Sequence, residues 1–174
     1  MPPTTKTTTT IPPVQIRCAT LEDLHAINEI YNYFVLHSAC TYQEEPEQMH
    51  ERHAWFAAHG PAHPITVALL AGEVVGWGSL SPYHKRAAYR NTVENSVYVA
   101  HTHHGRGIGR LLLQDLIDRA REIGHHTIIA AIDGEQTRSL TLHSKMGFLE
   151  VGQMRELGLK FGRWLDVHYL QLML

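Results

Sequence analysis

The sequence has few cysteines, little excess charge and no long hydrophobic run, and each shortage excludes a class of protein. Cys18 and Cys40 have neither CxxC nor zinc-site spacing, which favours two reduced thiols. The formal net charge is -2 without any long Lys/Arg run, so no general electrostatic binding to nucleic acid or anionic membrane is expected. No apolar run can span a bilayer, and the N-terminus has no apolar signal core. We therefore expect a cytoplasmic protein with small ligands.

The composition is that of a globular protein with one domain. Hydrophobic residues make up 44% of the 174 residues and charged residues 18%. A chain of this length suits a single core. Residues 1–13 are rich in Thr and Pro and show no hydrophobic periodicity, so they predict a disordered tail. The folded domain is expected to span residues 14–174.

Hydrophobic periodicity and turn residues predict strands mixed with helices. Thr20 suits the cap of a helix with apolar positions through Phe34, and Gly124 suits the end of a strongly amphipathic helix over 108–123. Ala71 and Gly72 predict a tight turn between antiparallel strands. Two further helices are expected over 46–59 and 137–146, and strands over 14–20, 65–70, 73–81, 91–100, 125–132, 148–157 and 165–174. This mixture predicts a single-sheet α/β (α+β) domain.

The segment 104–110, HGRGIGR, places three glycines between an expected strand and the helix over 108–123. Glycines let the backbone approach a phosphate closely, and the free N–H groups and dipole of a helix N-terminus favour negative charge. Arg106 and Arg110 add positive charge. The segment therefore predicts an anion site, with a tight turn before an ordinary helix as the alternative.

Two familiar phosphate motifs do not match this segment. A Walker A loop needs Gly-Lys-Ser/Thr at the start of the helix, where Gly109, Arg110 and Leu111 stand. A dinucleotide fingerprint needs a third glycine in place of Arg110 and usually lies in an N-terminal βαβ unit. Neither class of nucleotide-binding protein fits.

The segment instead resembles the motif of the GNAT superfamily of acyl-CoA-dependent N-acetyltransferases, Gln/Arg-x-x-Gly-x-Gly/Ala, with His104 in place of Gln or Arg. The stretches IYNYFV, TVENSVYV, LHSKMGF and KFGRWLDV resemble its phosphinothricin and methionine sulfoximine N-acetyltransferase branch. The resemblance implies a central, mixed, mostly antiparallel sheet flanked by helices. It also implies acetyl-CoA as co-substrate, the α-amino group of a small amino acid as acceptor, no metal, and a homodimer.

By this resemblance, Glu94 is the general base and His143 either protonates the departing thiolate or positions the amine. A glutamate has an ordinary pKa of about 4.3, so Glu94 needs burial or a water relay to act near neutral pH. Imidazole titrates near neutrality and can exchange a proton during turnover. The alternatives are a solvent-facing strand carboxylate and, among 14 histidines, an ordinary surface or core residue.

The resemblance indicates residues that bind acetyl-CoA, and the carboxylate of a small amino acid calls for cations among the residues that bind the acceptor. The backbone N–H groups of residues 97–99 are expected to hold the oxyanion, and Gln136 replaces the Asn of the family's Asn-x-x-Ser. The acetyl-CoA set is Val97, Tyr98, Val99, His104, Gly105, Arg106, Gly107, Ile108, Gly109, Arg110, Gln136 and Ser139. The acceptor set is Phe34, Lys85, Arg86, Tyr89, Thr92, Val93 and Glu94, followed by Lys160, Arg163 and Trp164. Solvated loop charges, a plain ladder strand and a core aromatic at Phe34 are the alternatives.

Two other functions stay open at this point. A group of histidines suggests a metal-binding protein, although no HExxH or Cys/His spacing accompanies them: His101, His103, His104, His125 and His126. A GNAT-fold sensor that binds CoA without turnover would be expected to have replaced catalytic residues. Glu94 and His143 argue against that sensor.

Overall fold

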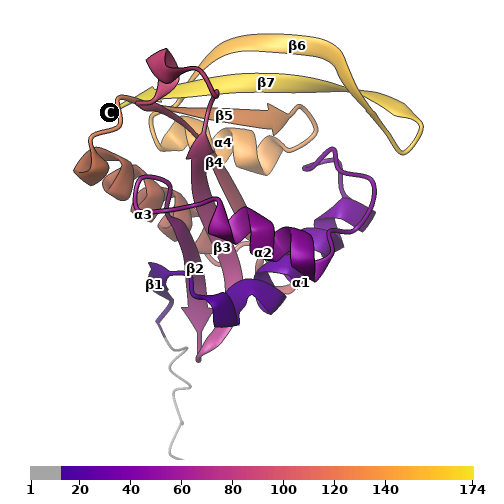
Figure 1. Cartoon of the computed structure of the whole chain (residues 1–174). Helices are drawn as coiled ribbons and strands as arrows, with labels where there is room; N and C mark the ends of the chain where they lie inside the picture. The colour runs from indigo at the N-terminus through magenta and orange to yellow at the C-terminus, as the bar shows by residue number, and fades with distance from the viewer. Residues whose placement is uncertain (1–12) are drawn as a thin grey trace, which may run out of the picture.

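The computed structural model describes residues 13–174, whose seven strands form one sheet in the order β1-β2-β3-β4-β5-β7-β6 (Figure 1). The expected tail, apart from Pro13, lies outside the described residues. The strands are β1 Gln15–Cys18, β2 Ile65–Leu70, β3 Glu73–Pro82, β4 Thr92–Val99, β5 Thr127–Asp133, β6 Leu149–Lys160 and β7 Arg163–Met173. The helices are α1 Leu24–His37, α2 Met49–Ala57, α3 Ile108–Ile123 and α4 Thr137–Lys145. Within 13–174 no helix is both long and apolar enough to cross a membrane.

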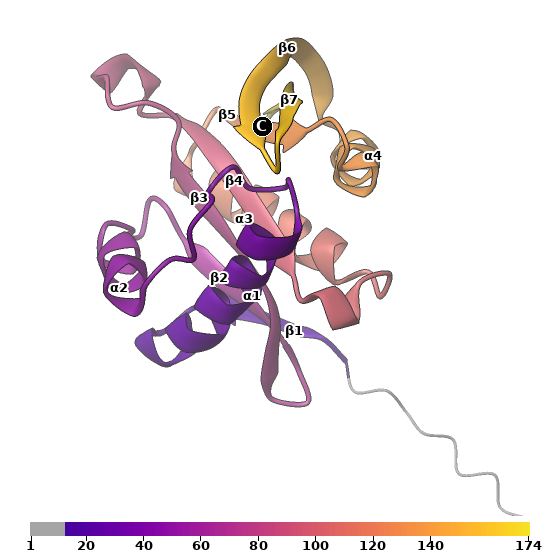
Figure 2. The same cartoon turned by 90° about the vertical axis from the view of Figure 1, so that its right-hand side faces the viewer.

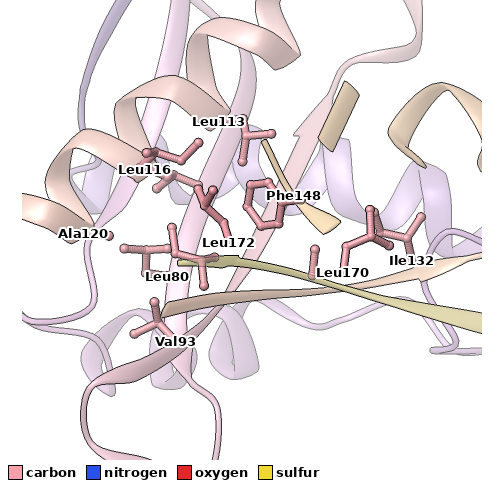
Figure 3. Close-up of a cluster of buried hydrophobic side chains, with 12 residues drawn as sticks. Leu80, Val93, Leu113, Leu116, Ala120, Ile132, Phe148, Leu170 and Leu172 are labelled. Carbon is pink, nitrogen blue, oxygen red and sulfur yellow. The ribbon is translucent and has the colours of Figure 1, made fainter. Parts of the chain in front are cut away.

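The helices cover both faces of the sheet (Figures 1 and 2). α1 packs on one face, where Leu24 and Ile27 meet Val67 and Trp77. α3 packs on the other face with α4, and Figure 3 shows Leu113 and Leu116 of α3 among side chains from β3, β4 and β7. The β4–β5 pair is parallel and the other strand pairs are antiparallel. The expected α+β domain with a mixed, mostly antiparallel sheet is confirmed.

Local signals placed most elements correctly. α3 begins and ends where its periodicity predicts, and Gly124 closes it with a φ of 91°. Ala71 and Gly72 have φ values of 52° and 87°, as the tight turn between β2 and β3 requires. The helix expected to start at Pro46 starts at Met49. Asn32 binds the backbone C=O and N–H of Glu47, and the Glu51 carboxylate accepts the Gln48 N–H, which fixes the start of the helix.

The C-terminal hairpin is longer than the sequence predicts. β6 and β7 continue through the expected loop and turn at Phe161 and Gly162, whose φ values are 52° and 70°. The pairing of β6 with β7 shifts register at two places, one of them between Met154 and Gly158. β7 lies between β5 and β6, which makes β6 the edge of the sheet.

Candidate active site

A cleft opens where the two parallel strands part. β4 and β5 pair only over residues 92–94 and 127–129. β3 stays paired with β4 as far as Val99, and β7 stays paired with β5 as far as Asp133. From Asn95 onward the edge of β4 that faces β5 has no strand partner, so backbone N–H and C=O groups on that side can bind a ligand.

A cavity of about 960 Å³, the β4–β5 cleft, occupies this parting. Its wall brings together both expected catalytic side chains and most of the expected acetyl-CoA residues. Of the expected residues it contains Phe34, Glu94, Val97, Tyr98, Val99, His104, Gly105, Gly107, Ile108, Gly109, Arg110, Gln136, Ser139 and His143. Arg106, in the same loop, is exposed and does not line the cleft. Residues far apart in the sequence thus share one site.

The loop before α3 presents unused backbone donors to the β4–β5 cleft. Within residues 13–174, the N–H groups of residues 105–109 donate to no backbone carbonyl or side chain. Gly105 and Gly107 both have a φ of 78°, which an L side chain adopts only with strain, and nothing lies within 4 Å of a Cβ at either position. Free donors, the helix dipole and Arg110 together make a site for an anionic group.

Glu94 stands at the point where β4 and β5 part. It lies opposite Ile129 in the last parallel pair and opposite Ser81 on β3. Its side chain is half-buried and lines the β4–β5 cleft. Burial raises the pKa of the Glu94 carboxyl group. A carboxylate with a raised pKa is a stronger base, so this environment suits proton acceptance near neutral pH.

His143 is buried on α4 and is hydrogen-bonded through both ring nitrogens. Nδ1 lies 2.9 Å from the carbonyl oxygen of Ser139, which can only accept, so Nδ1 carries the proton. Nε2 therefore accepts a hydrogen bond from Asn95 Nδ2, 3.0 Å away. Burial also lowers the pKa of His143. A neutral imidazole with its lone pair directed at Asn95 suits positioning better than proton donation.

The expected acceptor residues on α1 and β4 have three different surroundings. Phe34 lines the β4–β5 cleft and stacks on His104 at 5.9 Å between ring centroids. Thr92 is half-buried on the face of β4 that carries Glu94. The Val93 side chain is fully buried in the core against α3 and does not line the cleft.

The expected acceptor residues on loops are distributed around the molecule. Lys85, Arg86 and Tyr89 lie exposed between β3 and β4 and do not line the β4–β5 cleft. Arg163 pairs at the surface with Glu135, at 2.6 Å. Trp164 is exposed at the start of β7, outside the cleft. None of these side chains lines the cleft in this conformation.

Lys160 was expected to offer a cation to the substrate, and the structure corrects that expectation. Its side chain is buried, with 2% exposure. Nζ donates to the carbonyl oxygens of Ser38 and Thr41, in the segment that follows α1. The ammonium group therefore binds the backbone of the chain itself and is not available to a substrate carboxylate.

A second cavity, of about 360 Å³, lies on the α1 and α2 face of β3 and β4. It shares Ser96 and Tyr98 with the β4–β5 cleft. Side chains alternate along a strand, so both residues point to the same face as Glu94. Arg52 lines this cavity, where its buried guanidinium pairs with Glu47 and lies against Tyr31, Trp55 and Trp77. An amine at Glu94 would have space beside it for a side chain.

The histidines of the metal-binding alternative make other contacts. His101 stacks on Tyr33 at 3.8 Å, and His104 donates through Nε2 to the carbonyl oxygen of Val99. His125 Nε2 lies 2.7 Å from the carbonyl oxygen of Ala62. Among the described residues, no group of three or more His, Cys, Asp or Glu side chains could hold a metal ion.

Several cleft residues were missed by sequence reasoning. Asn95 follows Glu94 directly, and strand alternation alone would have placed it on the α4 face beside His143. Cys40 and Tyr42 reach the cleft from the segment after α1, where no periodic pattern marks them. The Tyr42 hydroxyl donates to Asp133 at 2.9 Å, across 91 positions of sequence. Contacts of that range have no local signal.

Comparisons with known proteins agree with this geometry. The sequence model of the Acetyltransferase (GNAT) family matches residues 27–148. The chain is 42% identical over 162 residues to the L-amino acid N-acyltransferase of Escherichia coli, covering 92% of this chain and 94% of that protein. It is 41% identical over 160 residues to the L-methionine sulfoximine/L-methionine sulfone acetyltransferase of Salmonella typhimurium, covering 91% and 94%. The structure of the phosphinothricin acetyltransferase of Sinorhizobium meliloti in complex with acetyl-CoA superposes with a TM-score of 0.90 at 38% identity, covering 92% and 88%.

Proposed function

This chain belongs to the acetyltransferase (GNAT) family and uses acetyl-CoA as co-substrate, and from that premise we propose that it acetylates the α-amino group of a small amino acid or analogue. The names of the relatives, which specify L-amino acids, methionine sulfoximine and phosphinothricin, support this acceptor class. The observation that carries the proposal is the position of Glu94. Its half-buried carboxylate lies where β4 and β5 part and lines the β4–β5 cleft, which shares Ser96 and Tyr98 with the second cavity.

The proposed seat of acetyl-CoA is the β4–β5 cleft. The free N–H groups of residues 105–109, the dipole of α3 and Arg110 suit the pyrophosphate, with His104 beside them. The unpaired edge of β4 suits the amides of the pantetheine arm, with Gln136 and Ser139 on the α4 side of the cleft. When bound, acetyl-CoA supplies the acetyl group as a thioester. Arg106 would contribute charge from the rim.

Glu94 is proposed as the general base. An amino acid carries an ammonium group at neutral pH, and it must lose one proton before its nitrogen can attack. The Glu94 carboxylate accepts that proton directly or through one water molecule, and its raised pKa makes this transfer more favourable. The backbone N–H groups of Val97 and Val99, which point away from β3, are the proposed donors for the negative charge that develops during the transfer.

His143 is proposed to act on the geometry of the site. Its neutral ring holds the Asn95 amide at the wall of the β4–β5 cleft. Donation of a proton to the departing thiolate would require a protonated Nε2, and burial opposes that form. We therefore favour the positioning role over the acid role.

The acceptor is proposed to lie on the Glu94 face of β4. Phe34 and Thr92 border that place, and the second cavity offers room for the acceptor's side chain. Lys85 and Arg86, with Tyr89, are among the exposed polar residues of the loop that leads into β4. They are our candidates for binding the acceptor's carboxylate.

The compartment and assembly state are also proposals. We place the enzyme in the cytoplasm, because acetyl-CoA is its co-substrate and both Cys18 and Cys40 are free thiols. We propose a homodimer on the grounds of exposed apolar side chains along the edge strand β6, including Val151 and Leu159.

One assay tests this function against its alternative, a sensor that binds acyl-CoA without turnover. The protein is mixed with acetyl-CoA and a panel of amino acids that includes methionine sulfone, methionine sulfoximine and phosphinothricin, and free thiol is measured. Amine-dependent thiol release is expected, with one thiol for each acetylated amine. Binding of acetyl-CoA without release for any amine would contradict the enzyme and favour the sensor. Chelator-sensitive metal retention without CoA binding would favour the metal-binding protein.

A further inference from the structure

The 38–43 segment leads from the C-terminus of α1 toward α2 and reaches the hairpin of β6 and β7 (Figure 2). Cys40 and Tyr42 in this segment line the β4–β5 cleft, and Gln43 lines the second cavity. The segment is therefore a wall of both cavities on the side where Glu94 is half-buried.

Lys160, near the end of β6, ties this wall to the far half of the sheet. Nζ donates to the carbonyl oxygens of Ser38 at 2.9 Å and Thr41 at 2.7 Å. Ser38 is the C-cap of α1, so the ammonium group lies at the negative end of that helix dipole. Within residues 13–174, no carboxylate pairs with Lys160. Because the buried ammonium group donates to these two carbonyl oxygens, it holds the backbone at Ser38 and Thr41 in place.

Tyr42 provides a second attachment of the same wall. Its hydroxyl donates to Asp133 Oδ2 at 2.9 Å, at the end of β5. Its ring packs on Gly158 of β6, where an added Cβ would come within 2.5 Å of ring carbons. The irregular register of β6 between Met154 and Gly158 thus brings a residue without a side chain against the ring.

We propose that Lys160 is a positioning residue for the amine acceptor, because it holds the 38–43 segment against the β6–β7 hairpin and so shapes the acceptor side of the site. This inference rests on the proposed N-acetyltransferase function. The glycine loop and the free edge of β4, which are proposed to bind acetyl-CoA, make no hydrogen bond with Lys160. Cys40 and Tyr42 also line the β4–β5 cleft, so loss of the clamp should weaken acetyl-CoA binding, but much less than acceptor binding. The acceptor loses a defined wall and should bind less well.

The kinetic test compares Lys160→Met, Lys160→Arg and the control Lys145→Met, an exposed lysine on α4. For Lys160→Met, the KM for methionine sulfone should rise by about tenfold, while the KM for acetyl-CoA changes less than about twofold. Lys160→Arg keeps donors at this position and should recover part of the loss. Gly158→Ala, which displaces Tyr42 and leaves Lys160 intact, should raise the amine KM in the same way. Equal changes in both KM values, or no change in Lys160→Met, would overturn the inference.

A second measurement tests the clamp without relying on activity. Amide hydrogen exchange in a peptide that covers residues 38–43 should accelerate in Lys160→Met and remain unchanged in Lys145→Met. If unaltered protein released no thiol with any amine, the proposed function would fail, and exchange would still decide whether the clamp exists. Unchanged exchange in folded Lys160→Met would show that Lys160 does not hold the wall. If Lys160→Met does not fold, Gly158→Ala supplies the same two readouts.

Discussion

Glu94 and Asn95 are neighbours on β4, and the alternation of the strand sends their side chains to opposite faces of the sheet. Glu94 lies on the face of β4 that also carries Ser96 and Tyr98, toward α1, whereas Asn95 meets His143 of α4. One strand therefore supplies the base on one side and a buried amide–imidazole pair on the other. The motif identified Glu94 and His143, but burial and the Asn95 contact decide their protonation states. The protonation states depend on the packing around these two side chains, which the sequence motif does not specify.

Substitution of Glu94 by Gln tests the base. The change removes the proton acceptor and preserves size, so turnover should fall by about 10²- to 10⁴-fold while acetyl-CoA affinity stays within about twofold. In the unaltered enzyme, kcat/KM should fall as pH drops through the raised pKa of Glu94, because the protonated carboxyl cannot accept a second proton. Steady-state kinetics across pH and acetyl-CoA titration check both. An unchanged pH profile in Glu94→Gln would remove Glu94 as base.

The same substitution makes a prediction about stability. Burial disfavours the ionised form of Glu94, which is the form that the proposed base requires. A neutral Gln at this position avoids that desolvation penalty, so the thermal midpoint of Glu94→Gln should equal or exceed that of the unaltered protein at pH 7. A marked drop in the midpoint would show that Glu94 supports the fold, and the kinetic result would then need a second variant such as Glu94→Asp.

The pairing of Asn95 with His143 predicts how that imidazole titrates. Burial lowers its pKa, so its titration midpoint should lie below the ordinary value of about 6.5. Asn95→Asp places a carboxylate beside Nε2 and should raise the midpoint relative to the unaltered protein. Histidine ring proton shifts measured by NMR against pH would report both midpoints, with His143→Gln used to assign the signal. Identical midpoints in the two proteins would contradict this account of Asn95.

At the scale of elements, α3 shows what a local pattern can predict and what it leaves out. Its bounds follow from apolar periodicity and from Gly124. Its close approach to β3 does not, because Gly76 and Gly78 matter only through partners distant in sequence. A Cβ at Gly76 would lie 3.2 Å from Leu112 of α3, and one at Gly78 would lie 3.0 Å from Leu116 of α3. Such glycines resemble ordinary strand interruptions until the packing is known.

The glycine loop at the start of α3 gives a prediction about co-substrate binding. Gly107→Ala keeps the space open but strains a φ of 78° by about 1–3 kcal/mol, which should shift the loop and weaken acetyl-CoA binding by roughly tenfold. Gly107→Asn tolerates that φ better and should lose less. Gly60→Ala, at an exposed position with nothing within 4 Å, is the matched control. Calorimetric titration with acetyl-CoA checks the order, and equal affinities for Gly107→Ala and Gly60→Ala would contradict it.

At the scale of the whole molecule, the features that the sequence does not predict are those that depend on contacts between residues far apart in the chain. The order of strands places β7 inside the sheet, so its apolar side chains, such as Leu170, are largely buried. β6 instead forms the edge and exposes Val151 and Leu159 by 57% and 53%. Sequence periodicity shows that a strand is apolar, but only the strand order shows which side of it reaches solvent.

The exposed edge of β6 predicts the assembly state. If two copies pair through this strand, light scattering after gel filtration should report twice the mass of one chain. Val151→Lys combined with Leu159→Lys places charge on the edge and should give a monomer at the same concentration, because lysines on an edge strand oppose pairing. Leu21→Lys is the control. The Leu21 side chain is 62% exposed and follows β1, at the edge of the sheet opposite β6, so this substitution should leave the mass unchanged. A monomer in the unaltered protein, or a dimer that tolerates both β6 lysines, would reject this edge as the interface.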